Sequence, residues 1–231
     1  IIRRMTMDEY GNAGADMLGY VFFQHMRMNL LLAMSRPNDP GTLLEFHSIY
    51  SSQNFWRRWL PLETQDPMLQ RWVKHVLPHS NYHKEGSDGL TSSGYFSGKF
   101  DPFIFDPRLR RLFCQKRSTV DFADAMNTRK IILVNLAKGQ LTEESSRFLG
   151  MLIIAKLMQA ILERVSIPQS QREDFYLYVD EFQSVATESF ITMLSEARKF
   201  GLCLVLANQF VSQIKDDRIT QAIFGNVGTR V

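Results

Sequence analysis

The pattern of apolar and polar residues changes near residue 120 and divides the chain into two parts. Before this point, short segments with a helical spacing of apolar residues alternate with turn-forming clusters such as SRPNDPG at 35–41. The segment 17–34 is strongly apolar and predicts a helix, and 42–50 and 54–60 predict two shorter ones. We therefore expect residues 1–120 to form a mostly α-helical domain.

The second part, 121–231, alternates short apolar runs with longer amphipathic segments. Two helices are predicted, one at 141–165 with Thr142 as its N-cap and one at 188–200 that ends at Gly201. Alternation of strands and helices predicts an α/β fold with a mostly parallel sheet and right-handed crossovers. The apolar runs that predict buried strands are IILVNL (131–136), FYLYV (175–179) and LCLVLA (202–207), and VGTRV (227–231) is a candidate for a fourth.

Polar side chains follow each predicted strand. Asp180 and Glu181 come directly after FYLYV, Gln209 follows LCLVLA, and residues 135–138 end the first strand. Ligands of parallel sheets bind beyond the carboxyl ends of the strands, so these tips are the candidate site. Taken alone, the two carboxylates are more simply explained as a cap of the following turn. The polar tip of the neighbouring strand favours a nucleotide-hydrolysis site, in which carboxylates hold Mg²⁺ and orient water.

The charge of the chain is nearly balanced. A net charge of +3 over 231 residues argues against global basicity, so any nucleic-acid surface must be local. One dense basic cluster is a candidate DNA path or subunit interface, although a solvated face is the default interpretation. Its members are Arg108, Arg110, Arg111, Lys116 and Arg117.

Other candidate features have simpler explanations. Trp56 and Trp59 flank two arginines and could stack on bases, but an amphipathic helix that buries both tryptophans is the favoured interpretation. His75, His79 and His83 have the four-residue spacing of metal ligands on a helix, but Pro78 interrupts the run, which favours scattered surface histidines. The two cysteines are far apart and predict reduced thiols of a cytosolic protein.

The residues around the tips resemble a known family. LYVDEFQSVATESFITMLSEARKFGLCLVLANQFVSQI, followed by AIFGNVGTRV, resembles the C-terminal half of the motor domain of the HerA–FtsK superfamily, and most closely the type IV secretion coupling proteins (TraG/TraD-like conjugative DNA-transfer ATPases). TLLEFHSIYSSQNFWRRWL and FDPRLRRLFCQKRSTVDF resemble the all-α domain that this family inserts in its motor. The resemblance implies a RecA-like, mostly parallel sheet of a P-loop NTPase motor with an inserted all-α domain.

The resemblance also implies roles for individual residues. Asp180 would be the Mg²⁺-side carboxylate of the Walker B element, Glu181 the catalytic carboxylate and Gln209 the sensor of ATP. Arg198 would act near the nucleotide of a neighbouring subunit, and its position before Gly201 predicts a place close to the catalytic edge. No GxxxxGK[ST] phosphate loop occurs in the sequence, so we expect that loop before residue 1 and no ATP hydrolysis by these residues alone.

The function expected from the resemblance is that of an ATP-driven DNA-translocating motor of conjugative or type IV secretion. Its expected partners are DNA, further copies in a homo-hexameric ring, a relaxase and secretion-channel proteins. The expected location is the cytoplasm, at the cytoplasmic face of a bacterial inner membrane, with membrane contact only through segments outside these residues. Alternatives are a HerA-type chromosomal DNA translocase, a secretion ATPase, or a non-catalytic adaptor that keeps the fold.

Overall fold

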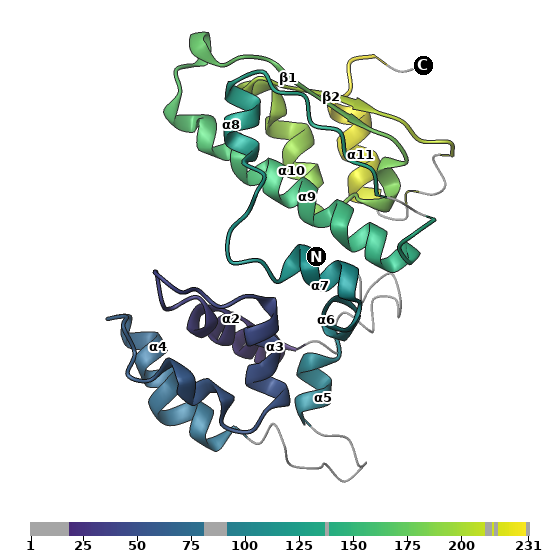
Figure 1. The fold of residues 1–231 in the computed structure, drawn as a ribbon. Helices are drawn as coiled ribbons and strands as arrows, with labels where there is room; N and C mark the ends of the chain where they lie inside the picture. Colours follow the sequence, from purple (N-terminus) through teal and green to yellow (C-terminus); the bar gives the residue numbers. More distant parts are fainter. Residues whose placement is uncertain (1–18, 81–91, 137–138, 211–213, 215–216, 230–231) are drawn as a thin grey trace. The chain divides into compact units, whose positions relative to one another are not determined.

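The computed structural model describes residues 19–80, 92–136, 139–210, 214 and 217–229 (Figure 1). The chain divides into two compact units, and the boundary lies between Ser118 and Thr119. Each unit has its own cluster of buried apolar side chains. The chain thus builds two separate hydrophobic cores.

The N-terminal unit consists of short helices, and its described residues include no strand. Its helix starts are set by local signals: Thr42 and Glu45 form a capping box, and Asp66 and Asp106 are N-caps followed by proline. Its elements are α2 (Tyr20–Ala33), α3 (Leu43–Ser51), η1 (Phe55–Trp59), α4 (Pro67–Arg71), η2 (Trp72–Val76), η3 (Leu77–His79), α5 (Ser92–Ser97), α6 (Asp101–Phe105) and α7 (Pro107–Phe113).

Aromatic side chains fill the core of this unit. Phe96 stacks on Phe22 and on Tyr50, with ring centroids 5.7 and 5.1 Å apart. Trp56 and Trp59 are only 7% and 3% exposed, so they are core residues and cannot stack on bases. The favoured interpretation of the FWRRWL segment is therefore confirmed, although the segment forms a 3₁₀ helix, η1, in place of an amphipathic α-helix.

The C-terminal unit combines helices with a two-stranded sheet. Its long helix begins as predicted, because the Thr142 side chain accepts a hydrogen bond from the Ser145 backbone N–H at 3.2 Å. The elements are α8 (Phe122–Asn127), α9 (Glu143–Glu163), η4 (Arg164–Ser166), η5 (Gln169–Gln171), β1 (Phe175–Val179), η6 (Phe182–Ser184), α10 (Glu188–Glu196), η7 (Ala197–Phe200), β2 (Leu202–Leu206) and α11 (Asp217–Asn226).

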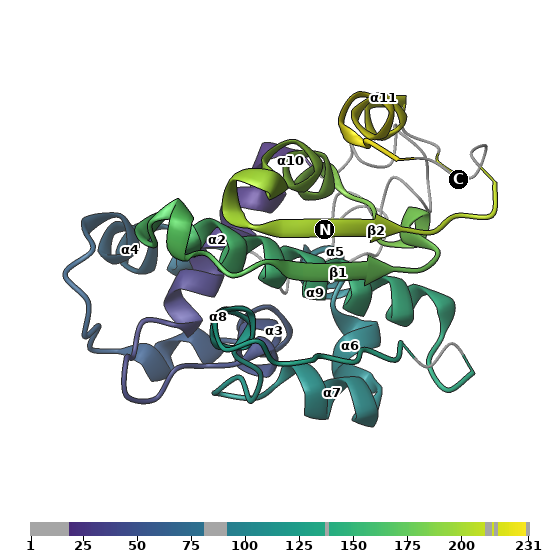
Figure 2. The same cartoon turned by 90° about the horizontal axis from the view of Figure 1, so that it is seen from above.

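Strands β1 and β2 are parallel neighbours, as the alternating pattern predicted (Figure 2). Their register runs from Phe175 opposite Leu202 to Val179 opposite Leu206. The crossover between them is the helix α10 and the turn η7, and it ends at Gly201 in the left-handed conformation (φ 70°). Gly201 is the predicted helix stop, and glycine adopts this conformation without a steric penalty.

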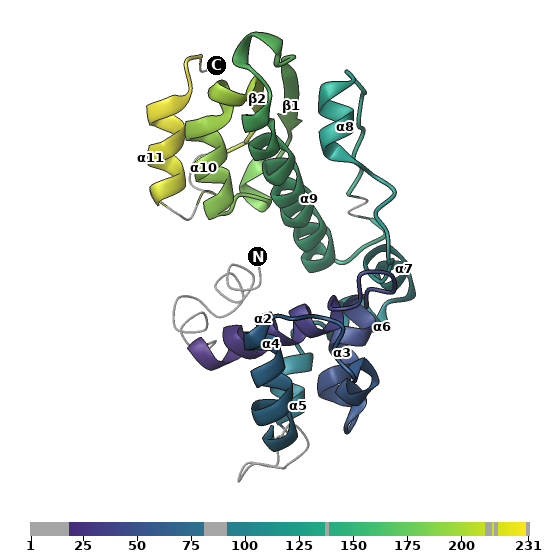
Figure 3. The same cartoon turned by 90° about the vertical axis from the view of Figure 1, so that its left-hand side faces the viewer.

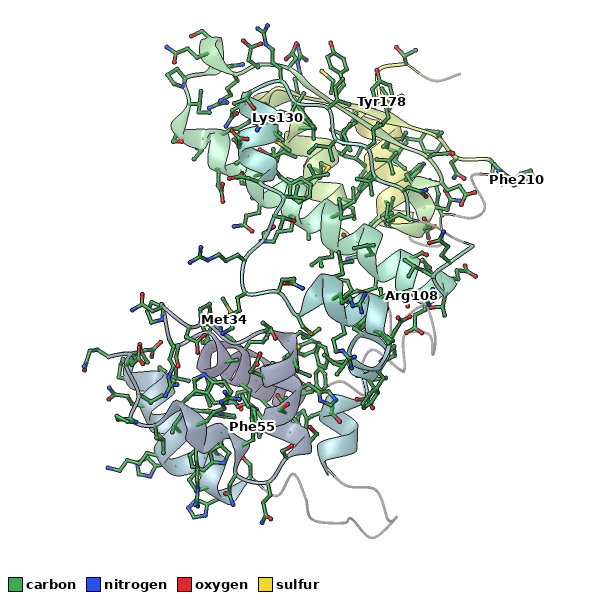
Figure 4. All side chains as sticks on the ribbon, viewed as in Figure 1. Met34, Phe55, Arg108, Lys130, Tyr178 and Phe210 are labelled. Atoms are coloured by element: carbon green, nitrogen blue, oxygen red, sulfur yellow. The ribbon has the colours of Figure 1, made fainter. Side chains whose placement is uncertain are left out.

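Only one face of this sheet is covered in the described part of the unit. Phe175, Leu177 and Val179 pack on the core formed with α9 and α10, whereas Tyr176 and Tyr178 are 57% and 70% exposed (Figure 4). The prediction that β1 is buried on both faces is therefore wrong. An apolar run shows that a strand is favourable, but the number of layers around the sheet decides which faces are buried.

The predicted strand at 131–136 is also wrong. These residues form no strand, and Ile131 and Leu133 are 88% and 91% exposed. Only the end of the segment is fixed, where Leu136 contacts the core and its backbone oxygen accepts a hydrogen bond from Ser146 Oγ at 2.9 Å. A β-strand needs a hydrogen-bonded neighbour at its side, and the sheet here has the order β1–β2 alone.

The C-terminal end differs from the prediction as well. Residues 227–229 form no strand, and 230–231 lie outside the described residues. Just before them, α11, which the sequence analysis missed, packs against α10, on the side of the unit away from α8 (Figure 3). The described fold is mostly helical with a small parallel sheet and is thus partly α/β. No helix in the described ranges combines the length and hydropathy that a membrane crossing requires.

Candidate functional site

The parallel register brings two polar strand tips together at one edge of the sheet. Beyond the last paired residues, Ala207 N donates to the Val179 backbone oxygen at 2.9 Å, and Phe182 N donates to the Ala207 backbone oxygen at 3.3 Å. Asp180 and Glu181 therefore lie beside the segment that begins at Ala207 and leads to Gln209. The third predicted tip was residues 135–138, and of these 137–138 lie outside the described residues.

The backbone of Glu181 is strained. This residue is left-handed, with φ 47° and ψ 44°, a conformation that costs a non-glycine residue about 1–3 kcal/mol. The turn is held from both sides, because Asp180 Oδ1 accepts from Glu181 N at 2.9 Å and the Glu181 backbone oxygen accepts from Ser184 N and Ser184 Oγ at 3.0 and 2.8 Å. Strain of this kind persists only where the surrounding structure enforces it, and it is concentrated at functional sites.

The two carboxylates are differently placed. Asp180 is exposed, and while its Oδ1 caps the turn, its Oδ2 has no hydrogen-bond partner among the described residues. Glu181 is half-buried at the same edge. One Asp180 oxygen therefore caps the following turn, as the simpler interpretation predicted, and the other oxygen remains available to a ligand.

The tip of β2 forms a turn that the sequence analysis did not assign. Asn208 Oδ1 accepts from Phe210 N at 3.2 Å, and Asn208 Nδ2 donates to the Phe210 backbone oxygen at 3.0 Å. Asparagine after a strand is a typical signal for such a turn. The turn leaves the Gln209 side chain exposed at the edge, next to the tip of β1.

Buried residues of α9 and α10 pack closely against the residues that follow Glu181. A Cβ atom added at Gly150 of α9 would lie 2.4 Å from Val185 Cγ1 and 3.1 Å from Leu136 Cδ1, so only glycine permits this approach. Phe182 is 4% exposed and stacks on Phe190 of α10, with ring centroids 5.9 Å apart. The residues directly after the strained turn are therefore fixed by tight packing.

Arg198 does not lie at this edge, which corrects the sequence-based expectation. It is in η7, before the first residue of β2, whereas Gln209 follows the last one. With about 3.3 Å per residue, the two ends of β2 are roughly 13 Å apart. A parallel crossover must return the chain to the starting edge of the sheet, so a residue that precedes the next strand lies opposite the strand tips.

The basic cluster belongs to the N-terminal unit, and three of its members have local partners. Arg108 forms an ion pair with Asp106 at 2.9 Å, Lys116 pairs with Asp39, and Arg110 donates to the Ile104 backbone oxygen at 3.4 Å. The hydrogen bond from Arg108 lowers the pKa of Asp106, and the one from Lys116 lowers the pKa of Asp39. The other two members, Arg111 and Arg117, are exposed.

The described residues give no support to a metal site at the regularly spaced histidines. His75 lies in η2 and His79 in η3, His83 is outside the described residues, and the described ranges contain no metal-binding cluster of His, Cys, Asp or Glu. The two thiols, Cys114 and Cys203, are free.

Residues 118–231 match the family described as the type IV secretion-system coupling protein DNA-binding domain, of the TrwB type. This part of the chain belongs to the type IV secretion coupling proteins. The chain matches no curated protein and no solved structure.

The matched range coincides with one structural unit. It begins at residue 118, and the C-terminal unit begins at Thr119. The range includes both strand tips and Arg198, whereas the basic cluster around Arg108 lies outside it. The resemblance to TraG/TraD-like coupling proteins is thereby confirmed for the C-terminal unit.

Proposed function

We propose that the C-terminal unit is the Walker B half of an ATP site in a motor that moves DNA for conjugation or type IV secretion. The observation that carries the proposal is the pair of adjacent strand tips, with Asp180 and a strained Glu181 on one and Gln209 on the other. The carboxyl edge of a parallel sheet is where α/β folds bind ligands. The family description supports DNA as the partner.

The donor set at this edge fits Mg²⁺ and ATP. Mg²⁺ takes oxygen ligands and keeps several of its waters, which suits the exposed, partly unpaired carboxylate of Asp180. Bound MgATP supplies an activated γ-phosphate. Glu181 then orients the attacking water and accepts its proton, and the Gln209 amide senses the γ-phosphate.

The proposed architecture has two further parts. The 231 residues contain no GxxxxGK[ST] motif, so the phosphate loop comes from sequence outside them, and these residues alone do not hydrolyse ATP. Residues 121–231 are the C-terminal part of a RecA-like motor domain, and residues 1–120 are a mostly α-helical insertion in that motor. The exposed Arg111 and Arg117 are the members of the basic cluster most suited to DNA phosphates, because Arg108, Arg110 and Lys116 have local partners.

Arg198 acts between subunits in this proposal. Its place at the opposite edge of the sheet keeps it away from the Asp180 and Glu181 of its own chain. Its side chain is exposed, and it forms no hydrogen bond or ion pair within the described ranges. Both observations suit a homo-hexameric ring in which Arg198 neutralises charge on the γ-phosphate of a neighbour.

The remaining alternatives differ in substrate or in activity. A HerA-type translocase or another secretion ATPase would use the same edge, and the family match favours a coupling protein, placed at the cytoplasmic face of the inner membrane with a relaxase and channel proteins as partners. A non-catalytic adaptor has no use for the strained Glu181, because glycine adopts this conformation without the steric cost. This observation favours the motor.

The Mg²⁺ role of Asp180 can be tested in the longer protein that includes a phosphate loop. We expect Asp180→Asn to weaken MgATP binding about tenfold or more, while ATP binding in EDTA stays unchanged. Asp174→Asn is the matched control, because Asp174 is an exposed carboxylate at the other end of β1. If calorimetric titration gives the same MgATP affinity for Asp180→Asn and Asp174→Asn, the metal assignment is wrong.

A further inference from the structure

Two arginines bind the backbone of the segment directly after Arg198. Arg172 Nη1 donates to the Lys199 backbone oxygen, and Arg164 Nη1 donates to the Phe200 backbone oxygen at 2.8 Å. Arg164 Nη1 also lies 3.5 Å from the Gly201 backbone oxygen. The carbonyl groups of two consecutive residues, Lys199 and Phe200, are thus held by arginines that precede them by 27 and 36 positions in the sequence.

Arg164 is the centre of this arrangement. It is 1% exposed, and its guanidinium group donates to Asn127 Oδ1 at 3.1 Å, to the Met126 backbone oxygen at 3.0 Å and to the Glu173 backbone oxygen at 2.9 Å. These acceptors belong to the end of α8 and the chain just before β1. Buried carbonyl groups need a hydrogen-bond donor, so Arg164 fixes the turn before β2 relative to both neighbours.

Arg172 and Gly201 complete the arrangement. The guanidinium group of Arg172 lies 5.3 Å from the centre of the Phe200 ring, and its Nε donates to the Ile167 backbone oxygen at 2.8 Å. A Cβ atom at Gly201 would be 3.2 Å from the Glu173 backbone oxygen and 3.3 Å from Arg164 Nη1. A side chain here would force these neighbours to shift slightly, and glycine adopts the positive φ without strain.

Arg198 differs from the other cationic side chains of this turn in having no partner among the described residues. Lys199 forms an ion pair with Glu196 at 2.8 Å, and Arg164 and Arg172 are engaged with backbone oxygens. The Arg198 side chain is exposed and makes no hydrogen bond or ion pair in the described part of the chain. The turn is therefore rigid in its backbone and leaves this guanidinium group available.

We propose that Arg164 and Arg172 are positioning residues that hold the η7–β2 turn so that Arg198 enters the nucleotide site of a neighbouring subunit. The inference rests on the proposed function, because it takes Arg198 as the residue that acts between subunits. Fixing the backbone in advance avoids an ordering cost when the side chain engages the γ-phosphate. A looser turn would leave ATP binding intact and slow the chemical step.

The test uses mixed rings of the longer, phosphate-loop-containing protein. One subunit carries Arg198→Ala and the other Glu181→Gln, so each productive interface pairs the intact Glu181 of the first with the intact Arg198 of the second. Arg172→Ala is then added to the Glu181→Gln subunit, whose own ATP site is already inactive. Any effect on ATPase rate must come from the arginine that this subunit presents, and not from damage to its own carboxylates.

We expect Arg172→Ala to lower the kcat of the mixed rings about tenfold with little change in KM for ATP, since small misplacements of a catalytic group have effects of this size. Arg172→Lys, which keeps a cation and a donor, should restore part of the rate. Arg129→Ala is the control, because exposed Arg129 pairs with Glu173 and donates no hydrogen bond to residues 199–201 in the described part of the chain. Equal rates with and without Arg172→Ala, in rings of equal composition, would overturn the inference.

The same experiments distinguish a failure of the proposed Arg198 role from a failure of the positioning role of Arg164 and Arg172. Rings of Arg198→Ala alone could keep full ATPase activity, or mixed rings of Arg198→Ala and Glu181→Gln subunits could form but show none. In either case Arg198 does not act between subunits, and both its proposed role and the positioning role of Arg164 and Arg172 fail. If that mixture is active and Arg172→Ala leaves it unchanged, only the positioning role fails.

Discussion

At the scale of single residues, the strain at Glu181 links stability to function. Glu181 is left-handed, and a glycine there would remove the steric cost while losing the carboxylate. We predict that Glu181→Gly raises the free energy of unfolding of the C-terminal unit by about 1 kcal/mol. Urea denaturation of the chain, followed by far-UV circular dichroism, measures this change.

Asn54 offers a matched control for that substitution. It is also left-handed, with φ 60°, but it lies in the N-terminal unit before η1. Asparagine tolerates this conformation better than glutamate, so Asn54→Gly should raise stability by less. A Glu181→Gly variant that is less stable than the wild type would mean that the turn is not strained and that the side chain contributes to folding.

A second prediction at this scale concerns His25. Burial lowers the pKa of His25, whose ring stacks on Phe96 at 5.0 Å and meets the Trp72 ring edge-on at 4.8 Å. The unfolded chain therefore binds the proton more tightly than the folded one, and stability is full above about pH 6.5 and falls as pH decreases through the folded pKa. Unfolding titrations between pH 7.5 and 5 should show this loss, and His25→Gln should reduce it. An equal pH dependence in that variant would assign the loss to another group.

At the scale of elements, the site depends on how closely α9 approaches the Glu181 turn. Gly150→Ala places a methyl group 2.4 Å from Val185 Cγ1, so the helix or the turn must move. We predict a loss of about 1–3 kcal/mol in the free energy of unfolding, typical of overpacking. Gly225→Ala in α11 is the control, because nothing lies within 4 Å of its Cβ position and alanine favours a helix there by up to about 1 kcal/mol. Equal stabilities of the two variants would contradict the close packing.

The elements also show what local patterns can and cannot predict. The start of α9 at Thr142 and the stop at Gly201 were predictable, because a cap is set by the residue and its immediate neighbours. The prediction of a strand at 131–136 was wrong because a strand needs a hydrogen-bonded neighbour, and no local pattern reveals whether one is present. Arg164 was missed because its acceptors come from three separate segments that only the fold brings together.

The candidate site was predictable to the extent that it follows from strand order. One crossover helix between two apolar runs is enough to place the tips after β1 and β2 side by side. The same rule, fully applied, also places Arg198 at the opposite edge. The left-handed backbone of Glu181 and the Asn208 turn depend on atomic contacts, and the sequence therefore gave no indication of the strain.

At the scale of the whole molecule, the two cores should unfold independently. All three tryptophans, Trp56, Trp59 and Trp72, lie in the N-terminal unit, so their fluorescence reports on that unit alone. We predict that Gly150→Ala lowers the midpoint of the circular dichroism transition and leaves the fluorescence transition unchanged. A shift of both transitions by the same amount would show that the two units unfold as one cooperative system.

If the edge formed by the tips of β1 and β2 hydrolyses ATP, Glu181→Gln in the longer protein with a phosphate loop should abolish turnover. This substitution keeps the size of the side chain and removes the group that activates water. We predict unchanged MgATP affinity, because Asp180 is intact, and a loss of DNA-stimulated ATP turnover of about 100-fold or more. Glu163→Gln, an exposed glutamate at the end of α9, should leave turnover unchanged. Near-normal turnover in Glu181→Gln would contradict the assignment of this edge as the catalytic site.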